Sequence, residues 1–292
     1  MRALAILLAI LLPVFSASAA DQSKTIVWNI QRQYVDMRMH HVPQPNADRL
    51  AQLRQTFHDL ECKGDRLREL PAGEGKNLVC TLPGTAQPGK TLETILLTAH
   101  YEHEGHGMSA IDNWSGAIML PFLYHALSAV PRQHTFVFAE VDGEAGAKAL
   151  LRSVPQVRAV VAFEALGLGP PCFYIHPSGS VPTFTEIVLK SALMRAAYLT
   201  GAREPEASIP GSWFKIDDTK EFRYRGIASI LFHSVSGATK HLPGSIEDTD
   251  EQIDGDAYFS SFNLLRYYMV VLDQLPANPL IQDQRAGSGR RR

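Results

Sequence analysis

Side chains that bind metal ions are concentrated between His100 and Ala117. The stretch holds three histidines and three acids, namely His100, His103, His106, Glu102, Glu104 and Asp112. Imidazole nitrogens and carboxylate oxygens are ligands that zinc takes in proteins. A zinc ion held by them lowers the pKa of its bound water and polarises a carbonyl, which is the chemistry of amide hydrolysis. The alternative interpretation is a solvated polar loop without a metal.

Acids and histidines also follow the apolar segments that are typical of buried strands. Four such segments are predicted, over residues 94–99, 135–139, 157–163 and 227–232. The residues that come directly after them are His100, Glu140, Glu164 and His233. Because ligands bind outside the carboxyl ends of strands in open α/β sheets, we expect a site at this edge.

The remaining pattern predicts the elements that position these residues. Helices are expected over residues 25–39, 46–60, 114–130, 145–154, 185–199 and 258–272. Pro121 should kink the third of them. An antiparallel hairpin is expected over 62–82, with its turn at 71–75. Alternating strands and helices predict an α/β fold, a largely parallel sheet covered on both faces.

Composition limits the class of protein. The 292 residues are 45% hydrophobic, which is enough to bury a full core. The 28 Lys and Arg balance 30 Asp and Glu, so no basic excess indicates a nucleic-acid partner.

Residues 1–20 have the pattern of a signal peptide, and no later segment is long and apolar enough to span a membrane. We therefore expect export to a periplasm or to the outside of the cell, and a disordered basic tail over 276–292.

Three cysteines remain after the signal peptide, at Cys62, Cys80 and Cys172. Export permits a disulfide, and Cys62–Cys80 is the favoured pair because both cysteines flank the predicted hairpin. Cys172 would then be free. The alternative is that all three thiols are reduced.

The chain from Asn77 to Leu272 resembles the secreted zinc aminopeptidases of metallopeptidase family 28, clan MH, as a divergent member. The strongest match is Asp112-Asn-Trp-Ser-Gly-Ala117, which resembles the family's Asp-Asn-x-Ser-Gly-Ala block. Weaker matches are His100-Tyr-Glu102, Phe138-Ala-Glu140-Val141, Glu164-Ala-Leu-Gly167, Asp217–Phe222 and His241. The resemblance implies a three-layer α/β/α sandwich with a mixed, largely parallel sheet. It implies one catalytic domain over 21–275, with N-terminal helices in 21–60 and the hairpin in 61–84.

The resemblance also implies the roles of individual residues. It predicts that His100, Asp112, Glu164 and His241 are metal ligands. Glu140 would be the general base, and Glu102 would orient His100. Val141 stands where the family has a glutamate ligand, so one zinc ion is favoured and a second site is weakened. Asp142 or Glu144 would replace that ligand if the loop is shifted.

The favoured function is therefore that of an exported zinc peptidase, an aminopeptidase acting on peptides or small amides. A glutaminyl cyclase, which has the same fold, is one alternative. The other is a catalytically impaired relative that acts as a binding or structural module. The zinc content of the purified protein separates this last interpretation from the first.

Overall fold

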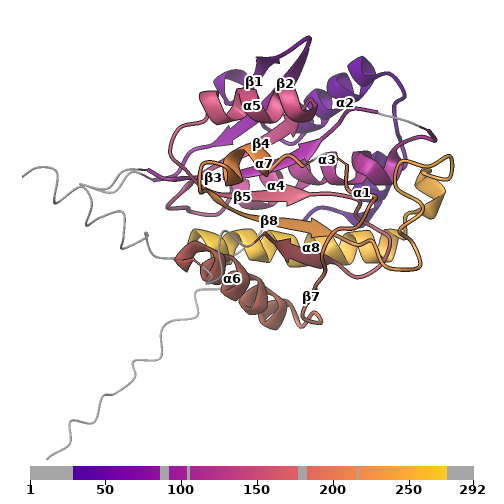
Figure 1. The fold of residues 1–292 in the computed structure, drawn as a ribbon. Helices are drawn as coiled ribbons and strands as arrows, with labels where there is room; N and C mark the ends of the chain where they lie inside the picture. Colours follow the sequence, from indigo (N-terminus) through magenta and orange to yellow (C-terminus); the bar gives the residue numbers. More distant parts are fainter. Residues whose placement is uncertain (1–28, 86–91, 104–105, 177–182, 216, 275–292) are drawn as a thin grey trace, which may run out of the picture.

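The computed structural model describes residues 29–85, 92–103, 106–176, 183–215 and 217–274. Within these residues the chain forms an eight-stranded sheet with the order β1-β2-β4-β3-β5-β8-β6-β7 (Figure 1). The strands are β1 (Leu67–Ala72), β2 (Gly75–Leu82), β3 (Thr94–His100), β4 (Thr135–Val141), β5 (Val157–Phe163), β6 (Cys172–Ile175), β7 (Glu206–Ala207) and β8 (Ala228–His233). Strands β4, β3, β5 and β8 pair in parallel, whereas β2 and β6 pair antiparallel to this central group. The predicted mixed, largely parallel sheet is confirmed.

Helices cover both faces of the sheet. They are α1 (Arg32–Met39), α2 (Asn46–Asp59), α3 (Ser115–Ala117), α4 (Met119–Ser128), α5 (Gly143–Ser153), α6 (Phe184–Thr200), α7 (Lys220–Arg223) and α8 (Gly255–Asp273). Side chains of α1, α2, α4, α6 and α8 share the larger apolar cluster with one face of the sheet. Side chains of α5 and α7 share a smaller cluster with the other face. Leu97 belongs to the first cluster and Leu96 to the second, as strand alternation requires.

The helix that the sequence predicts over 114–130 is interrupted at Ile118, between α3 and α4. The interruption lies one turn before Pro121, which has no N–H group to donate to the carbonyl of Ala117. Pro121 lies in the first turn of α4. Proline is tolerated there because the first N–H groups of a helix have no partner within the helix.

The disulfide between Cys62 and Cys80 is confirmed, and Cys172 is free. The hairpin register pairs Leu67 with Cys80, so Cys62 does not belong to the β1–β2 ladder. Cys62 follows the end of α2 instead. The bond therefore ties the N-terminal helices to β2, a strand that pairs with β4.

The short elements β6, β7 and α7 carry no pattern that predicts them from the sequence. The predicted signal peptide over 1–20 and the basic tail over 276–292 lie outside the described residues. In the described part of the chain, no helix combines the length and the apolar character that crossing a membrane requires.

Candidate metal centre

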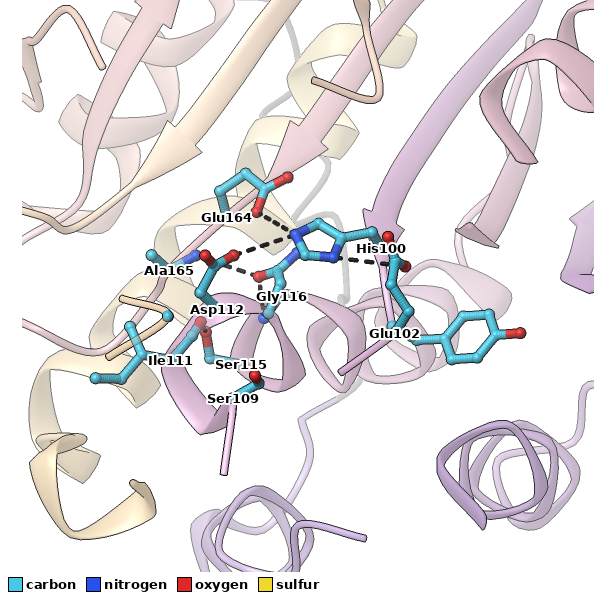
Figure 2. A network of polar contacts seen from close by, with 12 residues as sticks. His100, Glu102, Ser109, Ile111, Asp112, Ser115, Gly116, Glu164 and Ala165 are labelled. Atoms are coloured by element: carbon cyan, nitrogen blue, oxygen red, sulfur yellow. Dashed lines mark hydrogen bonds and ion pairs between the residues drawn. The ribbon is translucent and has the colours of Figure 1, made fainter. Parts of the chain in front are cut away.

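His100, Asp112 and Glu164 meet at the carboxyl ends of two paired strands. His100 ends β3, Glu164 follows β5, and these strands run in parallel. Asp112 lies in the turn between β3 and α3. The side chains of His100 and Glu164 are 3% and 2% exposed, and that of Asp112 is 14% exposed. The structure therefore brings three of the predicted ligands to the predicted edge of the sheet (Figure 2).

The three side chains converge on one ring nitrogen. The Nε2 atom of His100 lies 3.0 Å from Oε2 of Glu164 and 3.2 Å from Oδ1 of Asp112. One potential ligand atom from each residue lies within 4.8 Å of the other two. A ring nitrogen carries at most one proton, so it cannot satisfy two carboxylates equally. A cation that accepts one electron pair from each group satisfies all three, and this nitrogen and oxygen donor set fits zinc.

The electrostatics of the group agree with a cation site. Burial raises the pKa of Glu164 well above its usual range, and the nearby His100 opposes this shift only in part. Burial lowers the pKa of His100, but Glu164, Glu102 and Asp112 outweigh it and raise that pKa well above its usual range. His100 therefore has to balance several buried carboxylates.

Asn113 joins the turn of Asp112 to the end of β5. Its side-chain amide donates to the carbonyl of Phe163 over 2.8 Å. Its Oδ1 accepts from the N–H groups of Gly116 and Ala165 at 3.1 and 3.2 Å. These bonds hold Glu164, which lies between Phe163 and Ala165, at a fixed place relative to Asp112. Besides the predicted ligand Asp112, the Asp-Asn-x-Ser-Gly-Ala block therefore supplies the side chain that fixes the position of Glu164.

Asp248 holds the other side of the same turn. Its buried carboxylate accepts from the N–H groups of Ile111 and Asp112 at 2.6 and 3.2 Å. It also accepts from Gly244 at 2.8 Å. The loop around Gly244 is therefore drawn towards the metal centre. An added Cβ at Gly244 would lie 3.8 Å from Asp112 Oδ2, and its φ of +67° favours glycine as well.

Three further buried acids surround the group, and their oxygens have no hydrogen-bond partner in the described part of the chain. They are Glu102, Glu140 and Asp218. Glu102 lies 3.5 Å from Nδ1 of His100 and is placed to orient the ring. A carboxylate buried without a hydrogen bond is unfavourable, so Glu140 and Asp218 above all indicate a site that holds a cation, water or substrate.

Asp218 is the site residue that the sequence analysis does not single out. Its pKa is raised to about 7, mainly by burial; His100 opposes this shift, while Glu102 and Asp112 add to it. Its segment already matches the family over Asp217–Phe222. That resemblance is the signal that could have identified Asp218.

Glu140 lies inside β4, with no exposed surface. It is not one of the three residues that converge on a metal position. Burial and the nearby Asp218 raise its pKa well above its usual range. Its carboxyl group is therefore close to Asp218. Within the described residues, the ion pairs of His100 are with Glu102, Asp112 and Glu164 and not with Glu140.

The ligand position that the resemblance assigns to Val141 is not confirmed. Val141 is fully buried and belongs to the smaller apolar cluster with Leu96, Ala147 and Leu150. Strand alternation directs it to the face opposite to that of Glu140.

The neighbouring acids do not replace a ligand either. Asp142 accepts from the N–H group of Lys76, and the exposed Glu144 pairs with Lys148.

Replacing Val141 by glutamate should therefore destabilise the protein and add no metal. The substitution places a carboxyl group among apolar side chains, and the free energy of unfolding should fall by on the order of 3 kcal/mol or more. Urea unfolding with and without zinc measures this, with Val141→Leu as the control for packing. A second tight zinc site in the glutamate variant, with zinc restoring its stability, would show that residue 141 does reach the metal.

His241 is the predicted ligand that the structure does not bring to the group. Its side chain is 63% exposed and lies 3.6 Å from Glu247. It belongs to a series of turns without regular spacing, so the sequence does not show which way its ring points. Of the other histidines in the opening stretch, His103 contacts the carbonyl of Gly107 in its own loop, and His106 is exposed.

Residues 77–269 match the model of peptidase family M28. The chain belongs to this family. The M28 match spans most of the described chain and includes His100, Asp112 and Glu164. It begins after α1 and α2. A search of curated proteins finds no match.

Solved structures share the M28 fold of this chain at low sequence identity. A zinc aminopeptidase from Bacillus subtilis is 18% identical with a TM-score of 0.55, covering 66% of this chain and 49% of its own. The LapA aminopeptidase of Legionella pneumophila is 14% identical with a TM-score of 0.64. The alignment covers 84% of this chain and 71% of LapA. An Acidobacteriales bacterium glutaminyl cyclase is 17% identical with a TM-score of 0.64. The alignment covers 86% of this chain and 98% of the cyclase. This chain thus spans about half the length of the Bacillus subtilis enzyme.

Proposed function

We propose that this M28 protein is a zinc-dependent peptidase that acts as an aminopeptidase on peptides or small amides. The observation that carries the proposal is the convergence of His100, Asp112 and Glu164, with ligand atoms within 4.8 Å of one another. Catalytic zinc is held by three protein ligands and keeps one position open for water or substrate. Membership of family M28 supports the same chemistry.

We infer that one zinc ion is bound tightly. Among the described residues, a single group of three side chains has the spacing of a metal site. The two groups expected to complete a second site do not support one, since Val141 is in an apolar cluster and His241 is exposed. A second ion would have to use Glu102, Glu140 or Asp218, which do not form a group of ligand spacing.

The chain's own residues divide the chemistry between them. The bound zinc would lower the pKa of a water molecule and polarise the scissile carbonyl. Glu102 faces Nδ1 of His100 and keeps Nε2 directed at the ligand group. Glu140 takes the proton of the attacking water and returns it to the leaving amine. His100, Glu102 and Glu140 are all buried, so bulk water is kept away from them and their electrostatic interactions are stronger.

Glutaminyl cyclisation is the second candidate function. The observation that favours it is size: the alignment covers 98% of the Acidobacteriales bacterium cyclase, against 49% of the Bacillus subtilis aminopeptidase. In that reaction the amino group of an N-terminal glutamine attacks its own side-chain amide and releases ammonia. The same buried acids would move the proton.

A substrate panel with metal analysis tests these proposals. Zinc content is measured by elemental analysis, and hydrolysis is followed with aminoacyl fluorogenic amides. Mass spectrometry of glutaminyl peptides detects ammonia loss without peptide-bond cleavage. Zinc together with release of the fluorophore supports the aminopeptidase, and zinc with ammonia loss alone supports the cyclase. A protein that takes up no zinc after careful loading, and acts on neither substrate, contradicts both and favours a binding module.

We also propose that the chain is exported, on the strength of the signal-peptide pattern over residues 1–20. Fractionation of cells that produce the full-length chain tests this. Recovery of the protein in the cytoplasm with residues 1–20 intact would contradict the proposal.

A further inference from the structure

Arg49 is a fully buried arginine of α2, and it precedes the segment that matches family M28. Within the described residues, its hydrogen bonds all end on backbone carbonyls. Its Nε donates to Pro43 over 2.9 Å, and its two Nη groups donate to Tyr101, Met108 and Ser109. In the described part of the chain, no carboxylate lies within ion-pair distance of its guanidinium. The side chain therefore binds backbone, not a charged partner.

Three of the four carbonyls that Arg49 binds lie at the two ends of one loop. Tyr101 comes directly after His100, while Met108 and Ser109 come shortly before Asp112. One nitrogen, Nη1, reaches both ends, at 3.2 Å from the Tyr101 oxygen and 3.4 Å from the Ser109 oxygen. The guanidinium thus closes the loop that connects two proposed metal ligands.

Backbone bonds hold each end of the loop separately: the N–H of Tyr101 donates to the carbonyl of Val141 over 3.1 Å, and that of Met108 donates to the carbonyl of Asp248 over 2.7 Å. Arg49 adds a bond to both ends from one side chain. Ser109 has a left-handed backbone with φ of 46°, which a residue other than glycine adopts rarely. The guanidinium also lies 5.7 Å from the centre of the Trp114 ring, just beyond Asp112. The planar fork of arginine can reach several acceptors in fixed directions, which a lysine ammonium on a flexible chain cannot do.

Burying a guanidinium is unfavourable, and the surroundings offset this only partly. Burial lowers the pKa of Arg49 to about 10, while the negative charges of Asp248 and Glu102 raise it. The group therefore stays charged at neutral pH. If the position needed only bulk, a packed apolar side chain would serve at a smaller desolvation cost. Bulk therefore does not account for an arginine at this position, whereas its charge and its several N–H donors do.

We propose that Arg49 is a positioning residue of the metal centre, which sets the separation of His100 and Asp112 by joining the two ends of the loop between them. The inference rests on the proposed metal site. It makes α2 part of that site, although α2 lies outside the family match. The residue acts through the backbone and touches neither metal nor substrate.

Zinc titration of three variants tests this role. Arg49→Lys keeps the charge without the fork, and Arg49→Gln keeps a planar donor without the charge. The matched control is Arg132→Lys. Arg132 also donates to backbone carbonyls, those of Pro83, Leu127 and Ser128, but it lies near the start of β4, at the opposite end of that strand from Glu140.

Calorimetry on the full chain, with zinc alone as the ligand, should show the two Arg49 variants binding about 10–100-fold more weakly than wild type. The visible absorption of the cobalt-substituted Arg49 variants should change as well, because it reports ligand geometry. Arg132→Lys should lose stability while keeping the wild-type zinc affinity and cobalt spectrum. Circular dichroism establishes which variants are folded before titration.

The outcomes separate the two proposals. If wild type binds no zinc, the proposed function fails and the role of Arg49 fails with it. If wild type binds zinc and either folded Arg49 variant has the same affinity and cobalt spectrum, only the positioning role is wrong. Arg49 would then be a structural residue of the core.

Discussion

Asp112→Ala is expected to abolish tight zinc binding and hydrolysis together. Asp112 supplies one of the three atoms that converge within 4.8 Å, so the variant leaves two ligands where catalytic zinc requires three. His100→Ala should have the same effect on zinc. The backbone of the turn should remain in place, because Asn113 and Asp248 hold it through groups that the substitution does not touch.

Elemental analysis and calorimetric titration measure the loss of zinc, and fluorogenic amides measure the loss of rate. Asp256→Ala is the matched control, since Asp256 is an exposed aspartate at the start of α8 whose side chain is 80% exposed. It should keep wild-type zinc content and turnover. Full zinc occupancy in Asp112→Ala would show that this residue is not a ligand.

The positions that follow from the sequence are those that depend on strand ends. His100 and Glu164 directly end or follow apolar, β-branched segments, and the parallel pairing of β3 with β5 brings them together. Asp112 belongs to a block whose asparagine bonds to the end of β5, so its position is also fixed by local sequence. The fold follows from the same periodic segments.

The parts that the sequence does not predict depend on where a strand stops or how a loop turns. The apolar pattern ends the fourth strand at Ala139, but β4 continues to Val141. Alternation therefore extends to Val141 and directs it into an apolar cluster. His241 lies among turns, where no periodicity relates a residue number to a direction. Asp218 does not follow an apolar strand segment, and a single sequence does not show that its side chain is buried.

Glu140→Gln is expected to keep zinc and fold but to lose hydrolysis. The amide has the size of the carboxyl group and cannot accept the proton of the attacking water. Loss of a general base lowers the rate by about 10²–10⁴-fold. Stability should be unchanged or higher, because the substitution removes an acid that is fully buried without a hydrogen-bond partner in the described part of the chain. A gain in stability with a loss of rate is the sign of a residue kept for function.

Two further variants compare the role of Glu140 with those of the other buried acids. Glu102→Gln should weaken zinc binding by about 10–100-fold, because Glu102 faces the ring of a ligand and orients it. Asp218→Asn probes the other buried acid that raises the pKa of Glu140. Steady-state kinetics with fluorogenic amides, corrected for zinc content, compares all three. Wild-type turnover in Glu140→Gln together with a large loss in Asp218→Asn would transfer the role of base to Asp218.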